Sequence, residues 1–161
     1  MIEFDPIGWL NHDRPWPNVS GPAPGFTIRE QPIPTLLAMC CWGEARADGP
    51  LGMLLIGCVV RNRVRQDPRY GRGWIGVLTK PGAFRCFIPD DPHFEQVRFP
   101  LQFGSYHCWQ QACEAAADIL SGRAPDLTDG ATHYADETHP QDPAMILTII
   151  YRRRRFFRVS V

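Results

Sequence analysis

Lysine is almost absent from this sequence of 161 residues, because Lys80 is the only lysine among 17 basic residues and all the others are arginine. The basic residues are matched by 17 acidic ones, so the formal net charge is zero. A neutral chain has no strong field toward nucleic acid or an anionic membrane surface. We therefore exclude nucleic acid as a partner and interpret the run Arg152–Arg155 as a solvated strand edge.

Long hydrophobic runs are also missing. The longest, MLLIGCVV and AMILTIIY, fall well short of the roughly 20 residues that a membrane-spanning helix needs. The chain does not start with the basic stretch and apolar core of a secretory signal. These absences predict a protein that is made in the cytoplasm and does not insert stably into a membrane. Without internal repeats, the length predicts one domain.

Cysteine is present, but not in the spacing that metal sites or redox motifs require. The six cysteines include no CxxC pair, and most fall within apolar helical patterns, where a free thiol acts as a small hydrophobic group. We expect no disulfide, metal or cofactor. The conceivable zinc ligands fit no standard spacing; they are Cys86, His93, His107 and Cys108.

Proline and glycine are concentrated at the N-terminus. Residues 1–31 contain the stretch GWLNHDRPWPNVSGPAPGF, which can form neither a long helix nor a central strand. Exposing large aromatic rings to water is unfavourable, so we predict an arm that Trp9, Trp16 and Phe26 hold against the body, with a loose leader as the alternative. The predicted division is an arm over 1–31 and a catalytic domain over 32–161.

Helical periodicity is clear from Ile33 onward, with Pro34 near the helix start. Apolar residues recur three and four positions apart, the pattern of a buried helix face. The same step then reaches Glu44, which places an acidic side chain on the buried face at the end of the helix. The apolar residues of this stripe are Ile33, Leu36, Leu37, Cys40 and Cys41.

Two more helices are predicted, over about 50–65 and 106–120. The first is apolar nearly all round, which predicts a central helix. DDPHFEQVRFPLQFGS has no clear period and predicts a loop, whereas GATHYAD predicts a short extended piece. The end of the chain predicts a helix turn or strand and then a terminal strand. The fold class is therefore α+β, mostly α. The stripe of the first of these two helices is Leu51, Leu54, Leu55, Cys58 and Val59.

The environment predicted for Glu44 favours its protonated form. Loss of hydration raises the pKa of a carboxyl group, and the partial negative charge of a helix C-terminus acts in the same direction. A carboxylic acid that stays protonated near neutral pH can serve as a general acid. The alternative is a glutamate that bends out to solvent at a fraying helix end.

The order of four segments resembles the SleB-type cell wall hydrolases, which include spore cortex-lytic enzymes and related phage and bacterial muralytic proteins. The segments are WGEARADGPLGMLLIGCVVRNRV, GVLTKPGAFRCF, a helix and DGATHYAD, and the resemblance covers residues 35–135. Ala83 departs from the pattern, because the family often has glutamine before the phenylalanine. The residues after Glu137 resemble the family only through the final aromatic strand.

This resemblance implies a lysozyme-like fold, similar to goose-type lysozymes and soluble lytic transglycosylases. It also implies cleavage of peptidoglycan between N-acetylmuramic acid and N-acetylglucosamine, with Glu44 as the catalytic acid. His133 and Tyr134 alternate on a strand, so we expect one of the two to be structural. A helix-end cap at Asn62 and a core position for Phe84 are alternatives. The residues expected to bind the glycan strand are Trp42, Arg46, Asn62, Phe84, His133 and Tyr134.

Glycoside cleavage usually needs two carboxyl groups, and no spacing assigns a partner to Glu44. Lytic transglycosylases, which the family resembles, use one glutamate and the C6 hydroxyl of muramic acid, which closes a 1,6-anhydro ring. We therefore expect transglycosylation. A muramidase hydrolase with a second carboxylate and a non-catalytic wall-binding or virion module are the alternatives. The candidate second carboxylates are Asp48, Asp90, Asp91, Asp136 and Glu137.

A small wall-degrading enzyme without a signal or an anchoring module is typical of a phage or prophage endolysin. We expect a monomer that reaches the cell wall through a holin or after membrane damage. An exported bacterial enzyme or a virion-borne lysin would have the same features.

Overall fold

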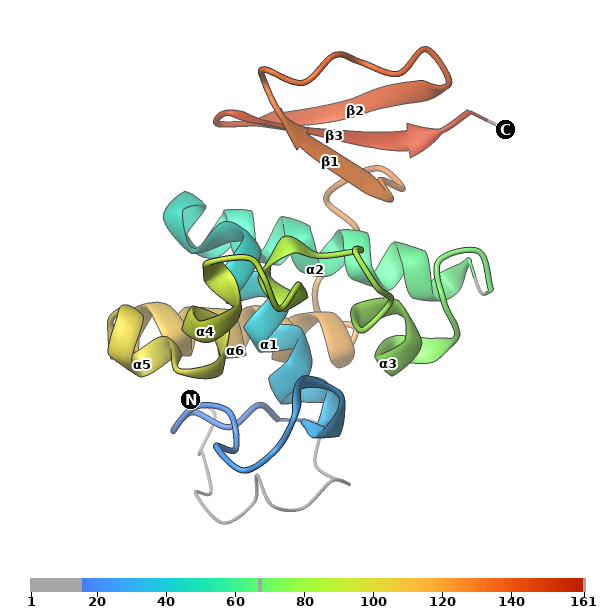
Figure 1. Cartoon of the computed structure of the whole chain (residues 1–161). Helices are drawn as coiled ribbons and strands as arrows, with labels where there is room; N and C mark the ends of the chain where they lie inside the picture. Colours follow the sequence, from blue (N-terminus) through green and yellow to red (C-terminus); the bar gives the residue numbers. More distant parts are fainter. Residues whose placement is uncertain (1–15, 67, 161) are drawn as a thin grey trace.

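The computed structural model describes residues 16–66 and 68–160. It shows a helical body with a small antiparallel sheet at one end (Figure 1). This confirms the predicted α+β class with mostly helix. The helices are α1 (Ile33–Ala45), α2 (Gly49–Arg65), α3 (Gly73–Leu78), α4 (His93–Arg98), α5 (Pro100–Phe103) and α6 (Tyr106–Leu120), the 3-10 turns are η2 (Ile28–Glu30), η3 (Arg46–Asp48) and η4 (Arg85–Phe87), and the strands are β1 (His133–Asp136), β2 (Met145–Tyr151) and β3 (Arg154–Val159).

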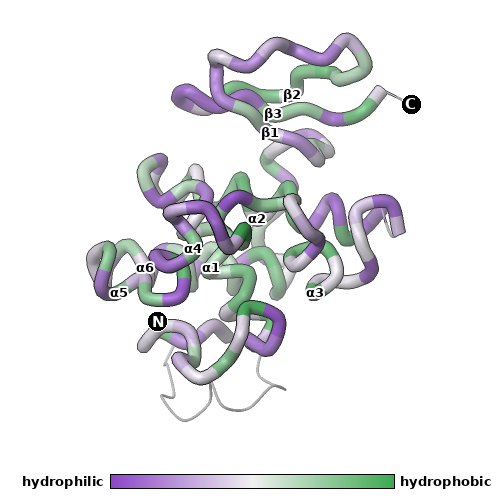
Figure 2. The backbone as a smooth tube through the Cα atoms, in the orientation of Figure 1, coloured by the Kyte–Doolittle hydropathy of each residue, from purple (hydrophilic) through white to green (hydrophobic). Residues whose placement is uncertain are grey.

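Helix α1 forms the centre of the body. Its predicted stripe is buried except for Ile33, which is partly buried, but Ala38 and Met39 on the other faces are fully buried as well. The helix packs against α2 and α6, and α3, α4 and η4 also contact it. In Figure 2 the middle of the body is largely hydrophobic and the surrounding turns are hydrophilic. The end of α1, including the turn that carries Glu44, is therefore surrounded by other elements.

Helix α2 lies between the rest of the body and the sheet (Figure 1). The prediction of a central helix holds for its middle, where every residue from 55 to 62 is buried, but not for its start, where Leu51 is 42% exposed and Leu54 is only partly buried. The helix packs against α1, α3, α6 and η3. The predicted break before α2 is confirmed: Gly49 has a φ of 76°, a left-handed conformation that glycine adopts without strain.

The sheet has the strand order β1-β3-β2, and both pairs are antiparallel. The sequence left a helix turn or a strand as alternatives before the terminal strand. The structure has a strand there, so β2 and β3 form a hairpin. Tyr134 pairs with Phe156, which is fully buried and joins the core. Because side chains alternate along a strand, Arg154 lies on the same face of β3 as Phe156. The sheet therefore turns one face, carrying Arg154 and Tyr134, toward the end of α1.

Residues 90–105 form two short helices, so the prediction of a loop is wrong. Helices α4 and α5 are too short for a helical period to stand out in the sequence. Burial of Val97 and Pro100 against the body stabilises them instead. Helix α4 packs against α1 and η4.

The described part of the N-terminal arm lies against the start of α1 and against α6. The backbone N–H of Asn18 donates to Oγ1 of Thr35 at 3.1 Å, and the indole N–H of Trp109 donates to the Asn18 carbonyl at 3.0 Å. Trp16 is half-buried under the guanidinium of Arg123, whereas Trp9 lies outside the described residues. Buried polar contacts thus hold this segment, which aromatic content alone did not indicate.

All six cysteines are free thiols, and all except Cys108 are buried. Within the described ranges no helix is long and apolar enough to cross a membrane.

Candidate active site

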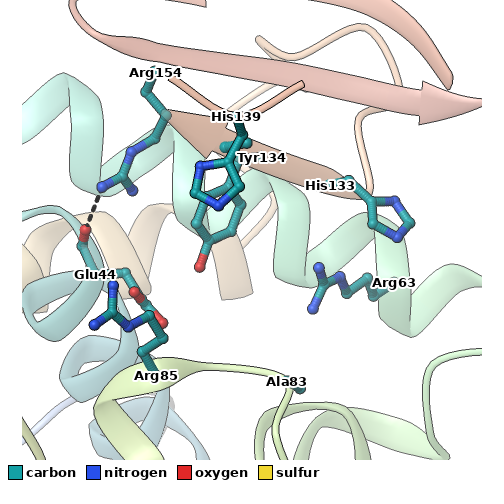
Figure 3. Close-up of a pocket in the computed structure, with 9 residues that line it drawn as sticks. Glu44, Arg63, Ala83, Arg85, His133, Tyr134, His139 and Arg154 are labelled. Atoms are coloured by element: carbon teal, nitrogen blue, oxygen red, sulfur yellow. Dashed lines mark hydrogen bonds between the residues drawn. The ribbon is translucent and has the colours of Figure 1, made fainter. Parts of the chain in front are cut away.

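A pocket of about 320 Å³ opens where the end of α1, the segment before η4 and the sheet meet (Figure 3). We call it the acid pocket. It unites residues that lie far apart in the sequence, since Glu44 comes from α1 and Arg154 from β3. Its lining consists of Glu44, Arg63, Ala83, Arg85, His133, Tyr134, Ala135, His139 and Arg154.

Glu44 is the acidic residue on the wall of this pocket. Its Oε1 atom is buried and has no hydrogen-bond partner within the described part of the chain. The alternative of a side chain that bends freely into solvent is therefore wrong. An acceptor that is buried and unpaired is unfavourable as a carboxylate, but it is suited to contact a substrate.

Burial raises the pKa of Glu44 above its ordinary value, as the helical phase predicted. The Arg154 guanidinium, the backbone at Arg85 and Cys86 and the Tyr134 hydroxyl act in the opposite direction, but burial outweighs them in setting the pKa. Glu44 therefore keeps its proton to a higher pH than an exposed glutamate does.

Gly43 allows α1 to approach η4 and α4 just before Glu44. A Cβ atom here would lie 2.5 Å from Cγ1 of Val97 and 2.6 Å from Cβ of Cys86. Both neighbours are buried and cannot move aside easily. The glycine before Glu44 thus fixes the distance between the acid and the η4 wall of the pocket.

Gly43→Ala is expected to destabilise the fold. Better helix propensity favours alanine by about 1 kcal/mol, but overpacking a core costs about 1–3 kcal/mol, and here three contacts with buried side chains fall below 3 Å. Urea denaturation should show a lower free energy of unfolding, and displacement of Glu44 should lower activity per folded molecule. Gly25→Ala is the control, because nothing lies within 4 Å of its added Cβ. Equal stability of the two variants would contradict this role of Gly43.

Arg154 connects the sheet to the end of α1. It donates through Nη2 to the backbone carbonyl of Glu44 at 2.7 Å (Figure 3). The same nitrogen lies 3.6 Å from a carboxylate oxygen of Asp48. Its guanidinium also lies over the Tyr134 ring. The interpretation of the arginine run as a solvated edge is therefore wrong for Arg154. The sequence held one signal for this placement: Arg154 stands two positions before the buried Phe156.

Tyr134 and His133 both line the acid pocket, although they alternate along β1. Burial, and next the charge of Glu44, raise the pKa of Tyr134, so its hydroxyl stays neutral. His133 packs edge-on against Tyr70, and burial together with Arg63 and Arg69 lowers its pKa. Both side chains thus present uncharged groups near neutral pH.

Four residues expected at the glycan site do not line the acid pocket. Trp42 and Phe84 are only 1% and 2% exposed and pack in the core. Arg46 lies over the Trp42 ring and donates to the Gln96 side chain and the Phe103 carbonyl, which turns it toward α4 and α5. Asn62 is buried. Trp42 and Phe84 were expected at the site because they belong to the motifs. A motif shows residue type but not exposure, so their burial could not be predicted from it.

Asn62 holds the loop that leads into β1. Its side-chain amide donates to Asp126, Thr128 and the Ala131 carbonyl at 3.1, 3.2 and 2.9 Å. Asp126 in turn accepts from the backbone N–H groups of Thr128 and Gly130. This network positions the start of β1, which carries His133 and Tyr134. Asn62 therefore stabilises the wall of the acid pocket without lining it.

Asn62→Ala is therefore expected to lower the free energy of unfolding by about 2–4 kcal/mol, because the hydrogen bonds of the amide group are lost and buried acceptors remain unpaired. Thermal denaturation measures this loss. Gln66→Ala, at an exposed position on the next turn of the chain, should change stability little. An Asn62→Ala protein with unchanged stability and weaker glycan binding would contradict the structural role.

The other candidate carboxylates do not line the acid pocket; among its described lining residues only Glu44 is acidic. Asp48 is held by Arg154, whereas Asp91 contacts Arg85 and His93. Asp90 is exposed. Hydrogen bonds from Thr138 and His139 hold the pKa of Asp136 well below its usual range, and Glu137 pairs with Arg153.

No group of three metal-binding side chains occurs among the residues that the structure describes. Of the conceivable zinc ligands, Cys86 is buried, His93 contacts Asp91, and His107 contacts Gln111.

The fold and the site define a small α+β protein whose pocket holds one buried carboxylic acid suited to proton donation. Residues 47–156 match the family described as Cell Wall Hydrolase. The chain belongs to this family, whose members are peptidoglycan-degrading enzymes. The matched range begins three residues after Glu44 and contains the other walls of the pocket. No curated protein and no solved structure matches the chain.

Proposed function

We propose that this protein cleaves the bond between N-acetylmuramic acid and N-acetylglucosamine as a lytic transglycosylase with Glu44 as its single catalytic acid and base. The observation that carries the proposal is the placement of Glu44: a carboxyl group with a raised pKa, and no other carboxylate among the described lining residues. An enzyme that hydrolyses the bond usually needs a second carboxylate across the sugar ring.

The reaction begins with the protonated Glu44, which donates its proton to the glycosidic oxygen as the bond to C1 of muramic acid breaks. The sugar becomes an oxocarbenium-like species, and Glu44 becomes a carboxylate. The carboxylate then accepts the proton of the C6 hydroxyl, whose oxygen attacks C1 and closes the 1,6-anhydro ring. Protons balance, no water enters, and Glu44 returns to its starting state.

The second step requires shielding of C1 from water. Trp42 and Phe84, which were expected to form this wall, lie in the core. In their place, Tyr134 and Ala83 line the pocket beside Glu44. The neutral Tyr134 hydroxyl is close enough to affect the pKa of Glu44 and can hydrogen-bond its carboxylate as it forms.

The expected product is therefore a 1,6-anhydromuropeptide, which is one water lighter than the corresponding hydrolysis product. Mass spectrometry of a digest of purified sacculi distinguishes the two. Muramic ends reducible by borohydride as the sole product would show hydrolysis and overturn the transglycosylase proposal. The search for a second carboxylate would then begin at Asp48, which Arg154 links to the Glu44 backbone.

A non-catalytic wall-binding or virion module is the competing class of function. Such a module would bind sacculi without releasing soluble muropeptides, so the same digest separates it from an enzyme.

We further propose that the protein acts as a monomeric phage or prophage endolysin that reaches the wall through a holin or after membrane damage. Detection of the protein in purified phage particles would contradict this role.

A further inference from the structure

A second pocket, of about 440 Å³, adjoins the acid pocket and shares Arg63, Ala83 and His133 with it. We call it the cationic pocket. Because the two pockets share a wall, a glycan strand bound at Glu44 can continue into the cationic pocket. Its lining consists of Arg63, Arg69, Tyr70, Lys80, Pro81, Gly82, Ala83 and His133.

Three cationic side chains meet at this pocket. Arg63 comes from the last turn of α2, Arg69 from the loop that follows, and Lys80 from the turn after α3. None of the described residues lining this pocket is acidic. Asp142, which does not line the pocket, is the acid whose charge raises the pKa of His133. In a chain with no net charge, this concentration of positive charge is local.

These cations have no anionic partner within the described part of the chain, whereas several surface arginines elsewhere do. Ion pairs occupy Arg85, Arg98, Arg123, Arg153 and Arg158. In contrast, Arg69 and Lys80 are exposed and make no ion pair there. Charge that is gathered around a hollow and left unpaired indicates an anionic ligand.

Arg63 is held in place for such a ligand. Its Nε donates to the Thr132 carbonyl at 2.7 Å, and the guanidinium lies over the rings of Phe84 and Tyr70. Figure 3 shows it beside His133, on the side of the acid pocket away from Glu44. A guanidinium fixed through Nε keeps its two terminal nitrogens for a carboxylate, which it can bind with two parallel hydrogen bonds.

We propose that the cationic pocket binds a carboxylate of the peptide stem on a muramic acid near the scissile bond. This proposal rests on the proposed function, since it names the part of the substrate that the groove next to Glu44 recognises. Peptide stems leave the glycan strand at each muramic acid and end in carboxylates, so an anion recurs along the strand. A strand with its scissile bond at Glu44 presents such an anion to Arg63, Arg69 and Lys80.

The test compares sacculi with free stem carboxylates against sacculi in which a carbodiimide and ammonia have amidated them. Gram-negative sacculi are used, because they contain no teichoic acid phosphate. The variant Arg69→Gln/Lys80→Gln removes two exposed charges from the cationic pocket. Its matched control, Arg123→Gln/Arg158→Gln, removes two exposed charges elsewhere on the surface.

Amidation should lower the kcat/KM of the wild type and of the control about fivefold, as expected for the loss of two exposed ion pairs. Arg69→Gln/Lys80→Gln should show the same loss on untreated sacculi and almost no further loss on amidated ones. An equal response of all three proteins to amidation would overturn the proposal.

Co-sedimentation with the Glu44→Gln protein separates this proposal from the proposed function, because it measures binding without turnover. Stronger binding to untreated than to amidated sacculi, abolished by Arg69→Gln/Lys80→Gln, supports the carboxylate site even if the wild type releases no muropeptides. Binding that is the same for both kinds of sacculi overturns the site even if the wild type cleaves the glycan.

Discussion

Glu44→Gln is expected to abolish the release of soluble muropeptides from purified sacculi while leaving the fold intact. Glutamine has nearly the same shape but cannot donate the proton to the glycosidic oxygen or accept one from the C6 hydroxyl. General acid–base catalysis contributes about 10²–10⁴-fold, so the rate should fall by at least this factor. Turbidity clearing and mass spectrometry of the supernatant measure the loss.

The stability of Glu44→Gln provides the control for folding, and the direction of its change relative to the wild type can be predicted. The folded-state pKa of Glu44 is raised, so the folded protein binds more protons than the unfolded chain at pH values between the two pKa values. The free energy of unfolding therefore falls as pH rises through this window. Removing the ionisable group should make the variant more stable than the wild type at pH 7, and the difference should disappear in acid.

Glu95→Gln is the matched substitution outside the pocket, because Glu95 is exposed and pairs with Arg98. It should retain full activity. Full activity in Glu44→Gln would instead remove Glu44 from the mechanism, whatever the stability of the variant.

The long helices and Glu44 could be predicted from the sequence because both depend on local periodicity. The predicted range of α6 is the observed one, Tyr106–Leu120, and the step that leads from Ile33 to Glu44 holds in the structure. A helix of three or more turns repeats its pattern often enough to be recognised. The short helices α4 and α5 repeat it too few times.

The rest of the acid pocket could not be predicted, because it depends on contacts between distant parts of the chain. The hydrogen bond from Arg154 to Glu44 joins residues that are 110 positions apart. Trp42 and Phe84 belong to the right motifs, but how deeply a ring is buried depends on elements that pack over it. The sequence alone thus identified the acid, whereas the residues that surround it depend on tertiary packing.

Arg154→Gln is expected to lower kcat about 10- to 100-fold. The variant loses a charged hydrogen bond to the Glu44 carbonyl and leaves Asp48 without its cation. Each hydrogen bond to a charged group contributes about 1.5–3 kcal/mol, and a small displacement of a catalytic group is enough to slow a reaction. Steady-state kinetics on solubilised glycan strands measures this effect.

The pH dependence shows whether Arg154 acts through Glu44. Its positive charge lowers the pKa of Glu44, so its removal raises that pKa further. Glu44 must be protonated to donate, so the alkaline limb of the kcat/KM profile should move to higher pH in Arg154→Gln. Arg153→Gln, at the neighbouring exposed position that pairs with Glu137, should change neither the rate nor the profile. A slower Arg154→Gln enzyme with an unmoved alkaline limb would mean that Arg154 holds the sheet in place without tuning the acid.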